Sequence, residues 1–272
     1  MDCWGSNFEG SATPPKDLKN VKDIKSPYFS SCAITWDHKV VCWGDQGTGG
    51  HKDVNLQFNE IKAFSVSDNH GCVIDSILGL QCWGNNESKQ LDIPSDIDIK
   101  KVDDVVAGFD GICVLYKRKI RCWGNDKNKI NDYIPNTIKG KIHEIKGQND
   151  KICLRDDESI KCWGELEGFP VLLDNPLVSL DYNTLKQWNV RGWNACAIDR
   201  DNIPKCWMGL VSHTPLNMPK ELPEFRVLSV GLMNVCIITK ENKYLCWGKS
   251  RSFNNTRAPL SIQSIFTNSY KK

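Results

Sequence analysis

The chain has 272 residues, of which 40% are hydrophobic and 25% are charged, and its 35 basic and 33 acidic residues leave a net charge of +2. This composition excludes a largely disordered chain. The balanced charge argues against a nucleic-acid partner, and no apolar run approaches the roughly 18 residues of a membrane-spanning helix. The first residues, MDCWGSNFEG, do not resemble a signal peptide, so any export leader is absent from this sequence.

The tripeptide Cys-Trp-Gly returns along the whole chain. Complete copies begin at Cys3, Cys42, Cys82, Cys122, Cys162 and Cys246, and a degenerate copy begins at Cys206. The successive gaps are 39, 40, 40, 40, 44 and 40 residues. A fixed period near 40 residues indicates a repeat protein.

Each repeat is predicted to open with a buried strand. Two apolar residues stand eleven and eight positions before the first cysteine of each repeat. In chain order they are Val21 and Ile24, Ile61 and Phe64, Val102 and Val105, Ile142 and Ile145, Leu185 and Trp188, and Phe225 and Leu228. The same offset six times predicts the same apolar strand six times.

A β-hairpin with one cysteine in each arm is predicted to follow each opening strand. In CVLYKRKIRC, alternating apolar residues flank a turn at Lys117-Arg118, and counting outward places Cys113 opposite Cys122. Facing residues of an antiparallel pair have Cα atoms about 4.5–5.5 Å apart, which suits a disulfide. The predicted disulfides are Cys32–Cys42, Cys72–Cys82, Cys113–Cys122, Cys153–Cys162, Cys196–Cys206 and Cys236–Cys246.

Small antiparallel units without helical periodicity between them predict an all-β, seven-bladed β-propeller formed by one domain, residues 1–272. Near the C-terminus, Ile262 and Ile265 repeat the apolar pair of an opening strand, and the next cysteine would fall at position 273. The N- and C-terminal strands are therefore expected to share one blade and close the ring. Cys3 is left unpaired: its partner lies beyond residue 272, or Cys3 is a free thiol.

The repeats resemble those of the regulator of chromosome condensation family. The resemblance is carried by VVAGFDGICVLYKRKIRCWGND, and by CWGDQGTGG and CWGNNESKQLDIP, which are similar to the closing segment of the family's repeat. It implies a seven-bladed propeller whose terminal strands share a blade. The family's Gly-x-x-His-Thr is eroded, with only His70 left of its histidines. The paired cysteines resemble an extracellular subset, which includes crinkly-type receptor ectodomains of plants.

The tryptophans of the motif are expected to pack between blades, because a large ring at the same place in every repeat is most simply a packing residue. Trp188 has the offset of a core residue, whereas Trp36 sits in a hairpin turn and is a second, weaker candidate for partner contact.

The sequence offers little for chemistry. The five histidines, at positions 38, 51, 70, 143 and 213, share no repeat position and are expected at the surface. No catalytic motif and no Cys-x-x-Cys occur, so no enzyme activity, cofactor or metal site is predicted. Disulfides at this density indicate an oxidising compartment, so we expect the protein outside the cell or in the secretory pathway.

The predicted partner-binding ring lies three and four residues before the first cysteine of each repeat, in the loop between the first and second strands. Its members are Tyr28, Phe29, Asp68, Asn69, Phe109, Asp110, Asn149, Asp150, Trp193, Leu232, Met233 and Tyr270. Aromatic and apolar side chains on one face of a disc favour a protein partner. The alternatives are a sugar-binding propeller that uses the same ring, and an intracellular exchange factor or adaptor for a small GTPase. Neither nucleic-acid binding nor membrane insertion is expected.

Overall fold

The computed structural model describes residues 10–27, 30–44, 51, 54–108, 110–124, 134, 138–148, 151–164, 184–191, 194–198, 200, 204–208, 222–230, 234–240 and 244–248. Regular structure in these ranges is β-strand, apart from short 3-10 turns such as η2 (Ile99–Lys101). The expected all-β fold class is therefore confirmed for the described part of the chain.

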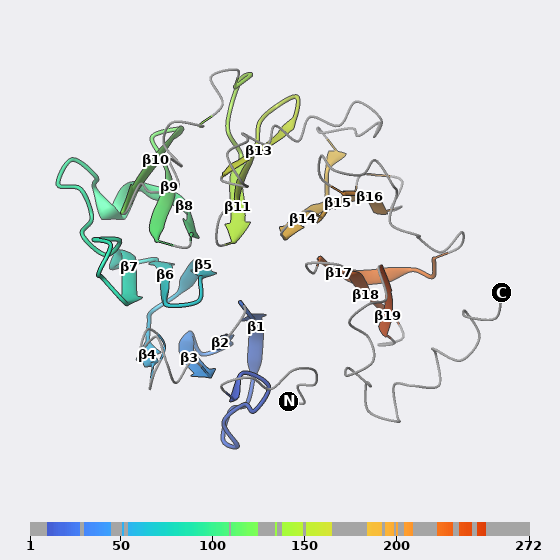
Figure 1. Ribbon diagram of the computed structural model, residues 1–272, viewed down its shortest axis with the longest axis horizontal. Helices are drawn as coiled ribbons and strands as arrows, with labels where there is room; N and C mark the ends of the chain where they lie inside the picture. Colours follow the sequence, from blue (N-terminus) through green and yellow to red (C-terminus); the bar gives the residue numbers. More distant parts are fainter. Residues whose placement is uncertain are drawn as a thin grey trace. The chain divides into compact units, whose positions relative to one another are not determined.

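The strands form small antiparallel sheets in which sequence neighbours pair (Figure 1). The first sheet holds β1 (Val21–Lys25), β2 (Ser30–Thr35), β3 (Lys39–Gly44) and β4 (Asn55–Gln57). The other described sheets are three-stranded: β5 (Ile61–Val66), β6 (His70–Asp75) and β7 (Gly79–Gly84); β8 (Val102–Ala107), β9 (Gly111–Tyr116) and β10 (Lys119–Gly124); β11 (Glu144–Gln148), β12 (Lys151–Arg155) and β13 (Ile160–Gly164); β14 (Gln187–Arg191), β15 (Asn194–Ile198) and β16 (Pro204–Met208); and β17 (Phe225–Val230), β18 (Asn234–Thr239) and β19 (Tyr244–Gly248).

The chain divides into two compact units, one with the strands up to β13 and the other with β14 to β19. In the first unit, the opening strands β5, β8 and β11 of consecutive sheets lie next to one another, and in the second unit β14 lies next to β17. Hydrogen bonds join neighbouring sheets of the first unit: Ala107 N donates to Ser65 Oγ over 2.9 Å, and Ile145 N donates to Asp104 Oδ2 over 3.0 Å. The strands expected to close a ring, at the two chain ends, fall outside the described residues.

The hairpins have the register that the sequence predicts. Cys113 stands opposite Cys122, and the turn residues Lys117 and Arg118 have φ angles of 49° and 62°, as a tight two-residue turn requires. The glycine after the motif tryptophan allows a close backbone approach. At Gly124, where φ is +113°, an added Cβ would lie 2.5 Å from the Asp110 carbonyl oxygen.

The disulfide of one sheet packs in the same core cluster as the motif tryptophan of the next sheet. Cys32 and Cys42 share a cluster with Trp83, and Cys113 and Cys122 share one with Trp163. Successive strand residues point to opposite faces, so a Cys-Trp pair presents sulfur to one neighbour and indole to the other. The predicted packing of the tryptophans between sheets is confirmed for Trp83 and Trp163. Trp43 is also buried, in a cluster with Leu18 and Ala33.

Most of the opening-strand positions lie in the core, as expected. Trp188 is 2% exposed and belongs to the buried core, whereas Phe64 and Leu185 are half-buried. The prediction is wrong for Ile24, which is 37% exposed. Ile24 lies on β1, the opening strand of the first described sheet, so no earlier described sheet of that unit covers it.

Replacing Trp163 should test the packing role directly. Trp163→Ala removes a ring that is 1% exposed, and we expect the free energy of unfolding to fall by about 3–5 kcal/mol because a large cavity is left behind. Trp36→Ala is the matched control, since Trp36 is 66% exposed, and should change stability by about 0.5 kcal/mol or less. Chemical denaturation of both variants measures the difference, and equal losses would contradict the packing role.

Candidate functional site

Cross-strand disulfides fix the hairpins that carry the candidate surfaces. The structure contains Cys32–Cys42, Cys72–Cys82, Cys113–Cys122, Cys153–Cys162 and Cys196–Cys206, with Cα–Cα distances of 3.9 to 4.1 Å. In the sixth predicted pair, Cys236 stands opposite Cys246 in the β18–β19 register, and Cys236 is disulfide-bonded. Each staple joins the second and third strands of its sheet. Cys3 lies outside the described residues.

Three members of the predicted partner-binding ring are described, and they form no exposed surface. Asp68 is 7% exposed, and Asn69 and Asp110 are half-buried. The Asn69 side chain is held in the β5–β6 turn, where its Oδ1 lies 2.7 Å from His70 Nδ1. The expectation of an exposed Asp68 is wrong, because this tight turn folds its polar side chains inward. The other nine members lie outside the described residues: Tyr28, Phe29, Phe109, Asn149, Asp150, Trp193, Leu232, Met233 and Tyr270.

His51 and His70 are buried, contrary to the expectation of surface histidines. The Trp83 indole N–H donates to His51 Nδ1 over 3.3 Å, and His51 Nε2 lies 2.8 Å from the Ser67 carbonyl oxygen. An indole N–H can only donate, so Nδ1 is the acceptor and Nε2 carries the proton that it donates to Ser67. His51 is therefore a neutral connector between the Cys32 staple, whose Sγ is 3.7 Å away, and the next sheet.

His70 connects two sheets in a similar way. Its Nε2 lies 3.3 Å from the Gly111 carbonyl oxygen of β9, and its Nδ1 lies 2.9 Å from Ser67 Oγ. Burial lowers the pKa of His70 to about 4, although the bond to Gly111 opposes this shift. His70 is thus neutral at neutral pH and acts as a core residue.

The position three residues after the first cysteine is a buried polar site that the sequence reading missed. It holds Thr35, Asp75, Tyr116, Asp156 and Thr239, each 5% exposed or less. Aligning the repeats on the first cysteine would have revealed an unbroken series of hydrogen-bonding residues at this offset. In each of these sheets, the polar residue at this position lies at or directly after the end of the second strand, where it closes the core just before the hairpin turn.

Asp75 and Asp156 are the most connected members of this series. Asp75 accepts bonds from the backbone N–H groups of Asn59, Ile77 and Leu78, at 2.6 to 2.9 Å. Burial would raise the pKa of Asp75, but these bonds hold it well below its ordinary value. Asp156 bonds Lys139 N and Lys161 Nζ, each over 2.9 Å, and its pKa is lowered to about 2 in spite of burial.

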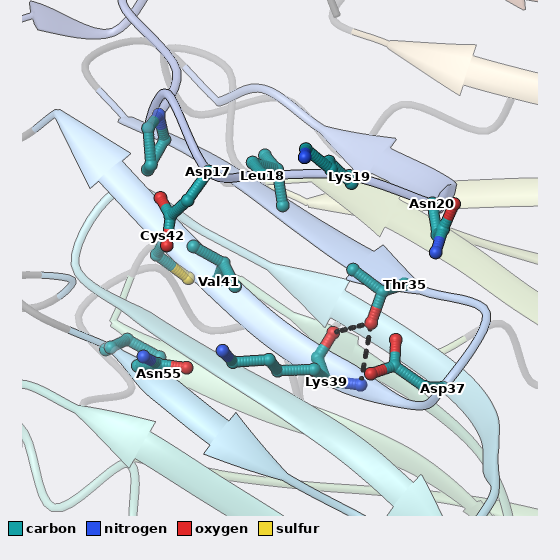
Figure 2. Close-up of a pocket in the computed structure, with 12 residues that line it drawn as sticks. Asp17, Leu18, Lys19, Asn20, Thr35, Asp37, Lys39, Val41, Cys42 and Asn55 are labelled. Atoms are coloured by element: carbon teal, nitrogen blue, oxygen red, sulfur yellow. Dashed lines mark hydrogen bonds between the residues drawn. The ribbon is translucent and has the colours of Figure 1, made fainter.

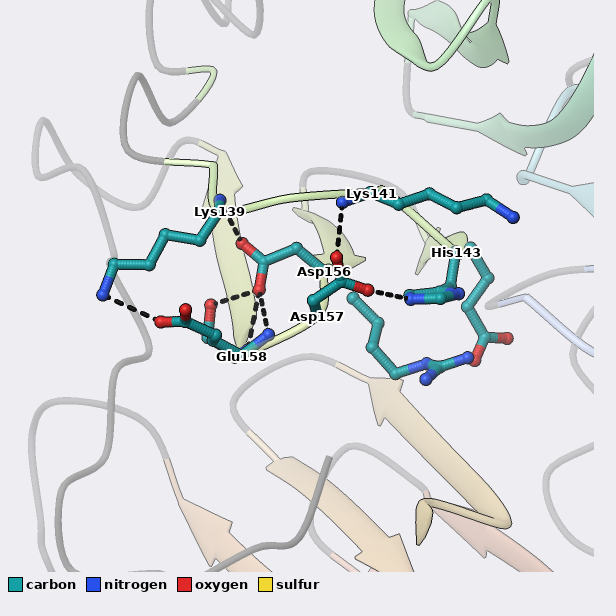
Figure 3. Close-up of polar contacts among 9 residues, drawn as sticks. Lys139, Lys141, His143, Asp156, Asp157 and Glu158 are labelled. Atoms are coloured by element: carbon teal, nitrogen blue, oxygen red, sulfur yellow. Dashed lines mark hydrogen bonds and ion pairs between the residues drawn. The ribbon is translucent and has the colours of Figure 1, made fainter. Parts of the chain in front are cut away.

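The turn leading into β11 is held by a set of polar contacts around Asp156 and its two following residues (Figure 3). His143 Nε2 lies 2.6 Å from Asp157 Oδ1, and the Lys141 backbone N–H donates to Asp157 Oδ2 over 2.8 Å. Lys139 Nζ and Glu158 Oε2 form an exposed ion pair of 2.9 Å. These contacts tie the β12–β13 hairpin to the segment before β11, so the cluster braces the fold.

A groove of about 440 Å³ crosses the first sheet, between residues 15–20 and strands β3 and β4 (Figure 2). Its lining combines Asp17 and Asp37 with Lys19 and Lys39. Thr35 Oγ1 donates to the Lys39 carbonyl oxygen over 3.2 Å and accepts from Lys39 N over 3.0 Å. The mixed charges give the groove no single ligand preference.

One group of side chains among the described residues has the spacing of metal ligands, namely Cys32, Cys42 and His51. Both sulfurs are held in a disulfide, which leaves one imidazole as a ligand. The group therefore does not fit a metal ion in this state. None of the helices in the described residues has the length and apolar character that crossing a bilayer requires.

The exposed large apolar side chains gather on the ends of hairpins. In the described ranges they are Ile24, Trp36, Leu56, Ile77 and Leu78, and the turns after β2 and β6 carry three of the five. Trp36, Ile77 and Leu78 are 66%, 59% and 45% exposed. The basic residues Lys100, Lys117 and Arg118 are exposed at the same end of the neighbouring sheet. We call Trp36, Ile77 and Leu78, together with Lys100, Lys117 and Arg118, the hairpin surface.

No protein-family model matches the chain, and no curated protein sequence matches it. Solved structures do. The CRINKLY WD40 ectodomain of the Arabidopsis thaliana receptor kinase ACR4 has a TM-score of 0.59 and 22% identity, over 86% of this chain and 81% of that chain. The fold is that of a β-propeller.

Two further structures are similar to this propeller. The ectodomain of the Physcomitrella patens receptor kinase CR4 has a TM-score of 0.61 and 19% identity, over 91% of this chain and 66% of that chain. Yeast RCC1 (Prp20) has a TM-score of 0.60 and 12% identity, over 90% of this chain and 73% of that chain. The expected likeness to the regulator of chromosome condensation family is therefore supported at the level of the fold.

Asp75→Ala should show how much the buried polar position contributes to stability. The change leaves the N–H groups of Ile77 and Leu78 in the β6–β7 hairpin, and of Asn59 before β5, without their acceptor, so we expect a loss of about 2–4 kcal/mol in the free energy of unfolding. Asp103→Ala, at an exposed position, should cost about 0.5 kcal/mol or less. Urea denaturation compares the two, and similar stabilities would contradict the role of Asp75.

His70 predicts a particular dependence of stability on pH. Its folded pKa of about 4 lies below the unfolded value of 6.5, so in this window the unfolded chain binds a proton that the folded chain does not. Stability should be full above pH 6.5 and fall by up to roughly 3 kcal/mol as the pH drops toward 4. In His70→Gln the part of this slope that His70 contributes should be absent. Denaturation at several pH values measures it, and an unchanged slope would contradict a buried neutral His70.

Proposed function

We propose that this protein is a disulfide-stapled propeller that binds a protein partner, outside the cell or in the secretory pathway. In this proposal the chain forms one seven-bladed domain of the regulator of chromosome condensation type, without catalytic activity. The observation that carries it is the exposure of Trp36, Ile77 and Leu78 on hairpins fixed by the Cys32–Cys42 and Cys72–Cys82 staples.

Exposed apolar side chains on a rigid support suit protein binding for two reasons. Burying them in an interface removes apolar surface from water, and a fixed hairpin loses little conformational entropy when it binds. The described residues offer no comparable constellation for chemistry, since the one buried metal-type cluster is a disulfide beside a histidine.

The similar structures support the same class of function. Two are receptor-kinase ectodomains, and yeast RCC1 (Prp20) was solved with Kap60 bound to it. The ectodomains also support the oxidising location that the disulfides suggest. The partner-binding ring of the sequence analysis is proposed only for its members outside the described residues, because Asp68 is buried.

The mass of the natively sourced protein tests the staples. With six disulfides, reduction should add about 12 Da, and alkylation without reductant should label at most one thiol, that of Cys3. Thirteen labelled thiols would overturn the oxidised scaffold and favour the intracellular exchange-factor alternative.

Cross-linking tests the kind of ligand. The oxidised protein, carrying a photoreactive group near Trp36, should cross-link to a protein in secreted or cell-surface fractions, and prior reduction should abolish this. Saturable binding to a glycan array, without a protein cross-link, would overturn the proposal in favour of the sugar-binding alternative.

A further inference from the structure

We propose that the hairpin surface docks an acidic protein segment that carries bulky apolar side chains. The inference rests on the proposed function, and it adds the place of binding and the chemistry of the partner. It is carried by the continuity of the surface, by its exposed apolar groups and by the sign of its charges.

The surface continues from the β6–β7 hairpin onto the next sheet. Gly79 follows Leu78, and it lies so close to η2 that an added Cβ would be 2.4 Å from the Ile99 carbonyl oxygen. Lys100 is thereby placed beside the apolar end of the hairpin. The Asp98 backbone N–H then donates to Tyr116 Oη over 3.2 Å, and Lys117 Nζ lies 4.8 Å from the centre of the Tyr116 ring.

The hairpin that carries Trp36 is joined to the β6–β7 hairpin through residues 58–61. Phe58 N donates to the His38 carbonyl oxygen over 3.1 Å, and Ile61 N donates to His38 Nδ1 over 3.3 Å. Asn59 in turn donates two bonds to the Asp75 carboxylate, of 2.6 and 3.0 Å. Hydrogen bonds therefore join the first two hairpin ends, and the close packing of Gly79 against Ile99 adds the third, all within the first unit.

The charges of this surface favour an acidic occupant. Lys100, Lys117 and Arg118 are exposed, and the ion pairs of the described residues do not include them.

The nearby carboxylates are already engaged. Asp96 pairs with Arg121 over 2.8 Å, Asp98 pairs with Lys101 over 3.1 Å, and Asp75 is buried. Near Trp36, Lys22 Nζ lies 5.5 Å from the ring centre. The pKa of Asp37 is lowered mainly by hydrogen bonding with Thr35, and the attraction of Lys39 adds a smaller part.

This combination sets what the partner must offer. Apolar side chains would cover Ile77, Leu78 and the Trp36 ring, while carboxylates beside them would meet the lysines and the arginine. A basic or purely polar segment would leave cations facing cations or apolar groups facing water. The discrimination between acidic and basic segments should therefore weaken as salt is added.

The test uses the full oxidised chain and labelled short peptides in which Glu alternates with Leu and Trp. Two matched peptide sets carry Lys or Gln in place of Glu. We expect fluorescence anisotropy to show saturable binding of the Glu set, with at least about tenfold weaker binding of the other two. Binding of the Glu set should weaken with rising ionic strength.

Two variants locate the binding. Ile77→Ser with Leu78→Ser removes apolar contact, and Lys117→Asn with Arg118→Asn removes charge while keeping a residue that tolerates positive φ. Each should weaken binding of the Glu set by at least about tenfold, and only the charge variant should also reduce the salt dependence. Lys16→Asn with Lys89→Asn is the control of equal charge, with Lys89 also at positive φ (58°), and should bind like the parent.

The outcomes separate this inference from the proposed function. Equal binding by the parent and both hairpin variants would overturn the inference, although a protein partner could still bind elsewhere. No binding of the Glu set, or preference for the Lys set, would overturn the acidic chemistry, while the cross-linking experiment decides the function independently. Self-association of the parent that both variants abolish would assign the surface to a second copy of the chain and also overturn the inference. An unchanged unfolding midpoint in each variant excludes misfolding as the cause.

Discussion

The cross-strand disulfide between the second and third strands is the constraint on which the other features of each sheet depend. It fixes the register of the hairpin, and the register fixes which face each side chain occupies. Since the second cysteine is followed at once by tryptophan, the sulfurs face one neighbouring sheet and the indole faces the other. The clusters of Cys32 and Cys42 with Trp83, and of Cys113 and Cys122 with Trp163, follow from this alternation.

A short repeated motif can therefore specify a whole stacking direction. Each sheet presents its disulfide to one neighbour and its tryptophan to the other. Because the tryptophan packs against the disulfide of that other neighbour, identical units stack in one order. His51 uses the same interface, because it accepts from Trp83 and lies beside the Cys32 sulfur. One copy of Cys-Trp-Gly would carry little information, whereas the series specifies how each sheet meets the next.

The features that could be predicted are those set by alternation and turn chemistry. The position of Cys113 opposite Cys122 followed from counting outward from Lys117-Arg118, and the core position of Trp188 followed from its offset. Burial of His51 could not be predicted, because its partners, Trp83 and Ser67, come from a different sheet. The predicted exposure of Asp68 is wrong for a related reason. An acidic residue in a loop suggests exposure, and only the geometry of the turn buries it.

At the buried polar position, three residues after the first cysteine of each repeat, the residue that stabilises the hairpin lies within a few residues of the side chains exposed at its end. Asp75 closes the core by holding the backbone of its own hairpin and of the segment before β5. Ile77 and Leu78 follow Asp75 by two and three residues. Their backbone N–H groups donate to Asp75, but their side chains are exposed. Substitutions at Ile77 and Leu78 thus change the exposed surface of the hairpin without removing the backbone hydrogen bonds to Asp75 that stabilise it. The same division in the first four described sheets lets hairpin ends as different as Trp36, Lys117-Arg118 and Asp157-Glu158 share one fold, and a binding surface can be composed from neighbouring ends without altering the core.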